Sequence, residues 1–172
     1  MKLYKFIPSN EDQIVSTKTK DDALMIINDL GKGNFRDLKN NLIELEGNAG
    51  VNDILWLHPE GILCRERAYQ LLRPLLLDSG KWNKMQLGEE VVYYFSVLSE
   101  LDVLNSQESK FVEFDGVLLG VEKYVLKDEQ VDEQPIFRIA SVKGHYPVVN
   151  HKFVEFIHVN GITGLDFEEL PS

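Results

Sequence analysis

Apolar residues recur at helical spacing in three segments of the chain. The first segment is 20–30, the second begins at Arg65, and the third is 151–159. Their apolar positions are Ala23, Ile26, Ile27 and Leu30; Ala68, Leu71, Leu72 and Leu75; and Phe153, Val154, Phe156 and Ile157. Pro74 interrupts the second segment, because proline lacks the amide donor and clashes one turn back. We therefore expect three helices, the second kinked at Pro74 or ending near Arg73.

Polar residues and glycines at the ends of these segments support the same assignment. Thr19 or Asp21 can cap the first helix, and Gly31 can close it in the left-handed conformation. Asn160 and Gly161 stand where the third helix should stop. The sequence therefore predicts where these two helices end as well as their apolar faces.

Short runs rich in β-branched and aromatic residues separate the helices and predict strands. The predicted strands are 3–8, 53–57, 61–64, 90–98, 110–116, 117–126, 136–142 and a closing strand with Leu165 and Phe167. Asp115-Gly116 is a favourable turn between two of them. Residues 61–72 and 146–157 also share one order: a short apolar strand and then an amphipathic helix. This internal echo is weak, since strand–helix–strand units are common.

These elements predict an α+β fold. We expect a mixed, largely antiparallel β-sheet with at least three packed helices. A chain of 172 residues suits one sizeable core or two small lobes. We therefore treat 1–172 as a single domain, with residues 1–50 as a candidate N-terminal lobe and 51–172 as the main region.

Composition narrows the classes of partner. The formal net charge is −10, and no basic patch is visible, so we expect no direct nucleic-acid binding. No apolar run is long enough to span a bilayer, and the N-terminus does not resemble a signal peptide. Cys64 is the only cysteine. We therefore expect a cytoplasmic protein that makes no membrane contact. The acidic charge suits either solubility or association with a basic partner, and charge alone does not choose between the two.

Two groups of residues could in principle form a metal site or a catalytic site. His151, Glu155 and His158 share one helical face, but the two histidines stand about 10 Å apart along the axis and cannot bind one zinc ion. We interpret that face as solvent-exposed. Cys64 at a helix start, with His58 nearby, is a conceivable nucleophile, although a lone cysteine is more often a buried apolar residue. We expect no metal and no cofactor.

The order of several short motifs resembles a family of bacterial immunity proteins found beside polymorphic toxin genes. The matching positions are Leu101, Asp102 and Ser106; Ile136, Phe137 and Arg138; and Phe153, Gly161, Ile162, Gly164, Leu165 and Phe167. The resemblance covers about residues 51–170. It departs at Cys64, where the family tends to have a serine.

The resemblance implies a non-enzymatic inhibitor that binds and neutralises a cognate toxin. The acidic charge fits a toxin with a basic, substrate-binding cleft, such as a nuclease acting in the cytosol. As candidate partner-binding residues we name the acids Asp128, Glu129, Asp132 and Glu133, since a charged loop can occupy an active site. Two alternatives stay open: a small cytoplasmic enzyme using Cys64 and His58, and an accessory protein of a toxin secretion apparatus.

Overall fold

The computed structural model describes residues 2–9, 14–30, 43–45, 52–115, 117–127, 131–142 and 146–172. In chain order the elements are β1 (Leu3–Pro8), β2 (Val15–Thr17), α1 (Lys20–Met25), η2 (Ile26–Leu30), β3 (Ile43–Leu45), β4 (Ile54–Leu55), β5 (Gly61–Cys64), α2 (Glu66–Leu75), β6 (Gly80–Leu87), β7 (Glu90–Val97), β8 (Glu100–Leu101), β9 (Lys110–Phe114), β10 (Val117–Lys123), β11 (Ile136–Ile139), β12 (Val148–Asn150), α3 (His151–Val159) and β13 (Leu165–Glu169). The segment η2 is a π-helical continuation of α1.

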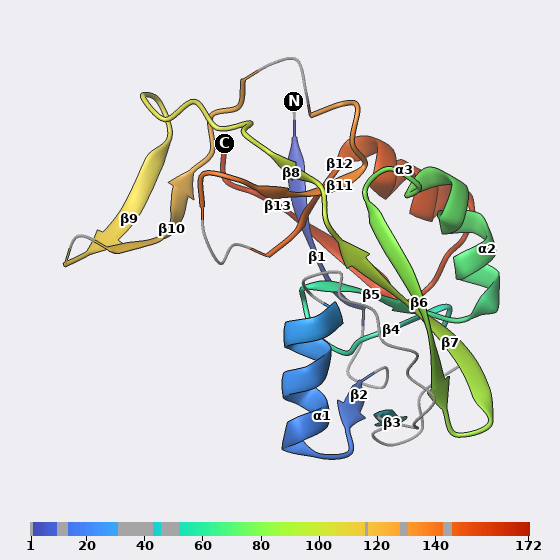
Figure 1. The fold of residues 1–172 in the computed structure, drawn as a ribbon. Coiled ribbons are helices and arrows are strands. Elements are labelled where there is room, and N and C mark those ends of the chain that lie inside the picture. The colour runs from blue at the N-terminus through green and yellow to red at the C-terminus, as the bar shows by residue number, and fades with distance from the viewer. Residues whose placement is uncertain are drawn as a thin grey trace.

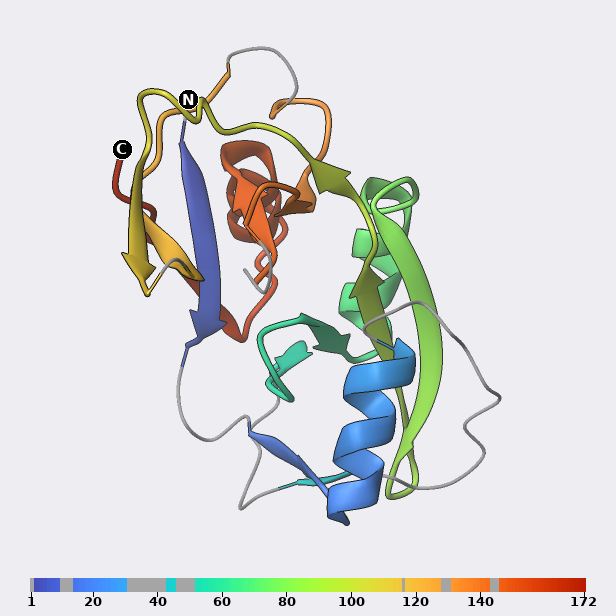
Figure 2. The same cartoon turned by 60° about the vertical axis from the view of Figure 1, so that its left-hand side comes forward.

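The described strands form two large sheets and a separate hairpin, seen in Figures 1 and 2. The five-stranded sheet has the order β13-β1-β12-β11-β8, and the six-stranded sheet has the order β2-β3-β6-β7-β5-β4. Most neighbouring strands are antiparallel, whereas β8–β11 and β3–β6 are parallel. The α+β class and the largely antiparallel pairing are confirmed. The expectation of one sheet is wrong, because within the described ranges β9 and β10 pair only with each other and the other strands divide between two sheets.

Two of the helices pack closely on the sheets. Leu72 of α2 and Phe153 of α3 are fully buried, and both belong to one core that also contains Phe6 of β1 and Phe95 of β7. By contrast, α1 has no buried residue, and its continuation η2 contributes the buried Ile26 to a second core. The expectation of at least three packed helices is thus only loosely met.

Each close-packed helix belongs to a unit with the same arrangement. In the first unit, β5, α2 and β6 follow one another, and β7 pairs antiparallel between β5 and β6. In the second unit, β12, α3 and β13 follow one another, and β1 pairs antiparallel between β12 and β13. The sequence echo therefore corresponds to two strand–helix–strand units built around a central antiparallel strand.

The helix ends agree with the sequence in most details. The Thr19 side chain caps α1 by accepting from the amide of Asp22. After α3, Gly161 adopts a φ of 56°, a left-handed conformation that suits glycine at a helix C-terminus. The second helix runs to Leu75, two residues beyond the expected end, with Pro74 in its last turn. That turn keeps a hydrogen bond from the Leu76 amide to the Leu72 carbonyl, 2.9 Å.

Candidate partner-binding surfaces

The predicted acidic segment lies partly outside the described residues. Asp128 and Glu129 are not described, whereas Asp132 and Glu133 stand in the turn before β11. This turn is attached to the start of α3: the Asp132 carbonyl accepts from Lys152 Nζ at 2.9 Å. The Asp132 carboxylate lies 3.8 Å from His151 Nδ1. Glu133 is exposed. The role of these four acids in partner binding stays a prediction.

The histidine stripe on α3 faces solvent, as expected. His151, Glu155 and His158 are all exposed. His151 approaches Asp132, while the His158 ring lies edge-on to Phe167, with 5.9 Å between ring centroids. Across the described part of the chain, no three His, Cys, Asp or Glu side chains are grouped closely enough to hold a metal ion.

Cys64 and His58 occupy environments that do not activate a thiol. Cys64 ends β5 with 0% exposure, and burial raises the pKa of its thiol, which disfavours the thiolate. His58 Nδ1 accepts from the Glu60 amide at 3.2 Å, and His58 Nε2 lies 3.1 Å from the Tyr94 hydroxyl. Burial lowers the pKa of His58 and raises that of Tyr94, so both groups stay neutral. Both hydrogen bonds of His58 thus go to groups other than Cys64.

Asp53 and Arg138 join segments that are far apart in the chain, and the sequence pattern did not predict these contacts. Asp53 Oδ2 accepts from Arg67 Nη1 at 2.6 Å and from the Thr163 amide at 3.0 Å, which links α2 to the loop after α3. Arg138 of β11 donates from Nε to the Val97 carbonyl and from Nη2 to the Glu60 carbonyl, each at 3.2 Å. Arg138 therefore connects the five-stranded sheet to the six-stranded one, a role that the Ile136–Arg138 motif does not reveal by itself.

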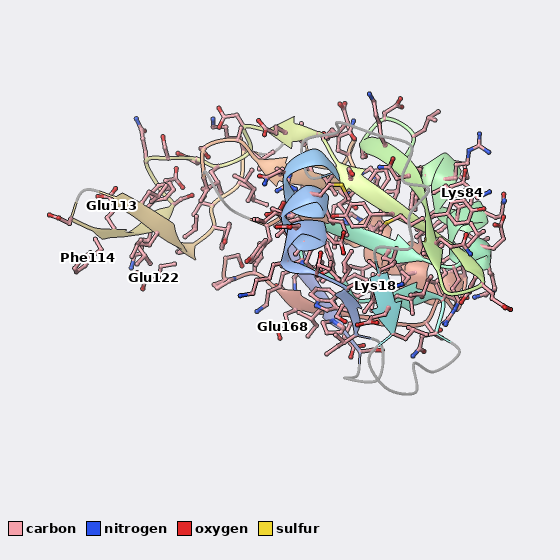
Figure 3. The ribbon with its side chains drawn as sticks, turned by 60° about the horizontal axis from the view of Figure 1, so that its bottom comes forward. Lys18, Lys84, Glu113, Phe114, Glu122 and Glu168 are labelled. Carbon is pink, nitrogen blue, oxygen red and sulfur yellow. The ribbon has the colours of Figure 1, made fainter. Side chains whose placement is uncertain are left out.

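The hairpin of β9 and β10, here called the arm, projects from the body of the protein (Figure 1). Its turn contains Asp115 with a φ of 51°, a conformation typical of tight hairpin turns. Figure 3 shows Glu113, Phe114 and Glu122 on the arm, well away from Lys18 and Lys84 on the body.

The two faces of the arm differ in what they contact. Phe111, Leu118 and Val121 are partly buried and pack against the core around Phe137 and Val148. The cross-strand pairs place Val112 and Phe114 on the opposite face, where Val112 is 44% exposed and Phe114 is 73% exposed. Leu119, at an irregularity of the pairing, is 64% exposed. In the sequence, "FVEF" puts apolar residues on both faces of one strand, but it does not show which face the fold leaves exposed.

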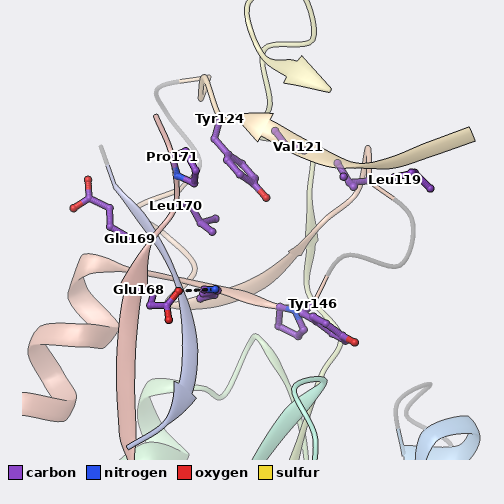
Figure 4. Close-up of a pocket in the computed structure, with 12 residues that line it drawn as sticks. Leu119, Val121, Tyr124, Tyr146, Glu168, Glu169, Leu170 and Pro171 are labelled. Carbon is purple, nitrogen blue, oxygen red and sulfur yellow. Dashed lines mark ion pairs between the residues drawn. The ribbon is translucent and has the colours of Figure 1, made fainter. Parts of the chain in front are cut away.

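A hollow of about 540 Å³ lies at the base of the arm. Leu119 and Val121 of β10 line one side of it, and Tyr146 and Leu170 line another (Figure 4). Tyr146 is itself 54% exposed. The Lys5–Glu168 ion pair closes part of the rim. The hollow therefore shares Leu119 with the exposed apolar residues of the arm.

The exposed carboxylates of the arm have no cationic partner within the described part of the molecule. Glu113, Asp115 and Glu122 are exposed, and none of them takes part in the ion pairs formed among the described residues. The Glu168 carboxylate on the body, by comparison, is paired with Lys5. The arm thus combines exposed apolar side chains with carboxylates that take part in none of the ion pairs of the described residues.

Comparison with known families decides the class of this protein. A model described as "Immunity protein family (Imm11)" matches residues 81–171, just over half of the chain. The chain belongs to this immunity protein family. The resemblance inferred from the short motifs is confirmed, although the match begins at β6 and not near residue 51. No curated protein matches the chain.

The matched region of this immunity protein contains β6, the arm, β11, α3 and β13. Cys64 and His58 lie outside it. Among the helices described, none is long and apolar enough to cross a membrane. The family assignment points to a toxin as the partner, and the surfaces within residues 81–171 are the first places to seek the contact.

Proposed function

We propose that this immunity protein binds a cognate bacterial toxin one-to-one and neutralises it by covering its active cleft. The observation that carries the proposal is the family match over residues 81–171. The burial of Cys64 and the neutral state of His58 support inhibition by binding and not by catalysis. A contact of ordinary size would cover about 800 Å² on each partner.

The charge of the chain supports a toxin with a basic cleft. The net charge is −10, and a cleft that binds a nucleic-acid backbone is positively charged. Opposite charges accelerate encounter and exclude wrong partners. We therefore propose a nuclease that attacks inside the cell, and we place the immunity protein in the cytoplasm with its target.

We further propose that residues 1–172 act as one immunity domain. The principal core draws Phe6 from the five-stranded sheet and Phe95 from the six-stranded sheet, and Arg138 joins the same two sheets. This arrangement supports one cooperative unit in place of independent lobes.

Co-expression with the toxin domain encoded by the neighbouring gene tests the proposal. We expect growth to be restored, and we expect the purified proteins to form a one-to-one complex. The Kd should rise with salt concentration, because screening weakens the attraction between an acidic inhibitor and a basic cleft. Complex formation without rescue would favour an accessory role in toxin secretion, and the absence of both would refute the immunity function for this toxin.

A further inference from the structure

We propose that the arm, together with the hollow at its base, is the surface that enters the basic cleft of the toxin. This inference rests on the proposed function and names the part of the molecule that performs it. The arm precedes the acidic residues that the sequence predicted at 128–133, and it was not among the predicted partner-binding residues.

The first argument is the cost of leaving these apolar side chains in water. Phe114 is 73% exposed and Leu119 is 64% exposed, and Tyr146 adds a half-exposed ring beside the hollow. Burial of a large apolar side chain against a partner is favourable, because it removes apolar surface from water. An exposed apolar surface of this kind with a polar border is typical of protein-binding sites.

The second argument is that the fold does not need these side chains where they are. The arm is attached to the body by its other face, through Phe111, Leu118 and Val121. Phe114 and Val112 point away from that attachment. We therefore infer that these two side chains contact a partner protein.

The third argument is charge. The arm carries the exposed acids Glu113, Asp115 and Glu122 against the exposed lysines Lys110 and Lys123, and none of the three acids takes part in the ion pairs of the described residues. A cationic cleft supplies the missing partners, whereas a second copy of this chain would bring like charges together. The occupant we infer is thus a basic toxin cleft with an apolar depression for Phe114.

The fourth argument is shape. A two-stranded hairpin is thin, and the five residues of β9 give the arm a reach of about 16 Å at the usual rise per residue. An element of this size can enter a groove that admits a nucleic-acid strand. The hollow at the base would then receive the rim of the groove, beside Leu119 and Tyr146.

The experiment compares two matched double variants of the full chain. The arm variant is Glu113→Lys with Phe114→Ser, and the control variant is Leu77→Ser with Asp78→Lys at the end of α2. Each variant replaces an exposed apolar residue and an adjacent exposed acid, and Leu77 is 69% exposed. Both should therefore keep the melting temperature of the wild type within about 2 °C, as expected for surface changes.

Binding is measured by calorimetry against the neighbour-encoded toxin domain, inactivated by a point mutation, and protection is measured by co-expression. We expect the arm variant to bind at least about 30-fold more weakly, as for the loss of an interface hot spot, and the control variant to stay within about threefold of wild type. Hydrogen exchange of the wild-type complex should show slowed exchange in the arm amides.

The possible outcomes distinguish an error in the arm proposal from an error in the proposed function. Failure of the wild type to bind or protect refutes the proposed function itself. Wild-type protection with equal binding by the arm variant refutes the role of the arm, as does equal weakening by both variants. A dimer of the free wild type that the arm variant dissolves, seen by sedimentation, would assign the surface to a second copy and also overturn the proposal.

Discussion

The two strand–helix–strand units of this immunity protein share an arrangement but differ in how each is completed. In the first unit the central strand β7 follows β6 directly, so the unit is local in sequence. In the second unit the central strand is β1, which comes from the opposite end of the chain. The first unit can form early from neighbouring residues, whereas the second must first bring the two ends together.

The residues that precede α2 and α3 also differ in how far their contacts extend along the chain. The Asn150 side chain is fully buried, accepts from the Phe153 amide at 3.1 Å, and donates to the carbonyls of Val131 and Gln134. At the start of α2, Arg65 makes no side-chain cap and instead pairs with Glu90 at 2.8 Å. Asn150 thus caps α3 and connects it to the turn at 131–134, whereas Arg65 leaves α2 without a side-chain cap and contacts Glu90 and the Asn52 carbonyl instead.

The largest expected difference between the units is at these two residues. Asn150→Ala removes the cap and leaves the buried Val131 carbonyl and the partly buried Gln134 carbonyl without their donor, so we expect a loss of about 3 kcal/mol in the free energy of unfolding. Arg65→Ala removes a partly exposed ion pair and a hydrogen bond to the Asn52 carbonyl, and it should cost about 1 kcal/mol. Urea denaturation of both variants measures the difference.

Asn150→Asp separates the two contributions of this side chain. Aspartate keeps the acceptor for the Phe153 amide but loses the donor to Val131 and Gln134. We expect it to destabilise the protein nearly as much as alanine. A variant as stable as wild type would mean that capping alone matters. The two units would then differ only in whether the helix has a side-chain cap.

A smaller effect is expected where the two units meet. Asp53→Ala removes the carboxylate that holds Arg67 of α2 and the Thr163 amide after α3. We expect a loss of about 2 kcal/mol, typical of hydrogen bonds to a charged group. Arg67→Ala should cost less, because its side chain is 55% exposed.

A double-variant cycle tests whether Asp53 and Arg67 act together. The loss in the double variant should be smaller than the sum of the single losses. Additive losses would contradict the direct link between the two units through this pair.

The smallest effect concerns pH and belongs to the first unit. Burial lowers the folded-state pKa of His58, so the unfolded chain binds the proton more readily. The contribution of this histidine to stability is therefore present above its ordinary pKa near 6.5 and is lost as the pH falls below it, by at most about 1.4 kcal/mol per pH unit.

His58→Gln provides the comparison for that effect. Between pH 7.5 and 5.5 the wild type should lose more unfolding free energy than the glutamine variant, measured by denaturant titration at each pH. Parallel losses would show that protonation of His58 does not weaken the first unit.

The sequence alone determined the elements that depend on neighbouring residues. The apolar spacing around Leu72 and Phe153 placed both helices, because a helix repeats its faces every few residues. Asp115 marked the turn of the arm, and the closing motif around Gly161 pointed to the family. These features are local, so a single segment carries their signal.

Only the tertiary structure decided the features that join distant segments. The division of the strands into two sheets, the placement of β1 in the second unit and the junction at Asp53 depend on contacts between residues far apart in sequence. The exposure of Phe114 could not be predicted either, because the sequence of a strand does not show which of its faces the fold covers. The candidate toxin-binding surface therefore follows from how the arm docks on the body, through Phe111 and Val121, and not from its own sequence.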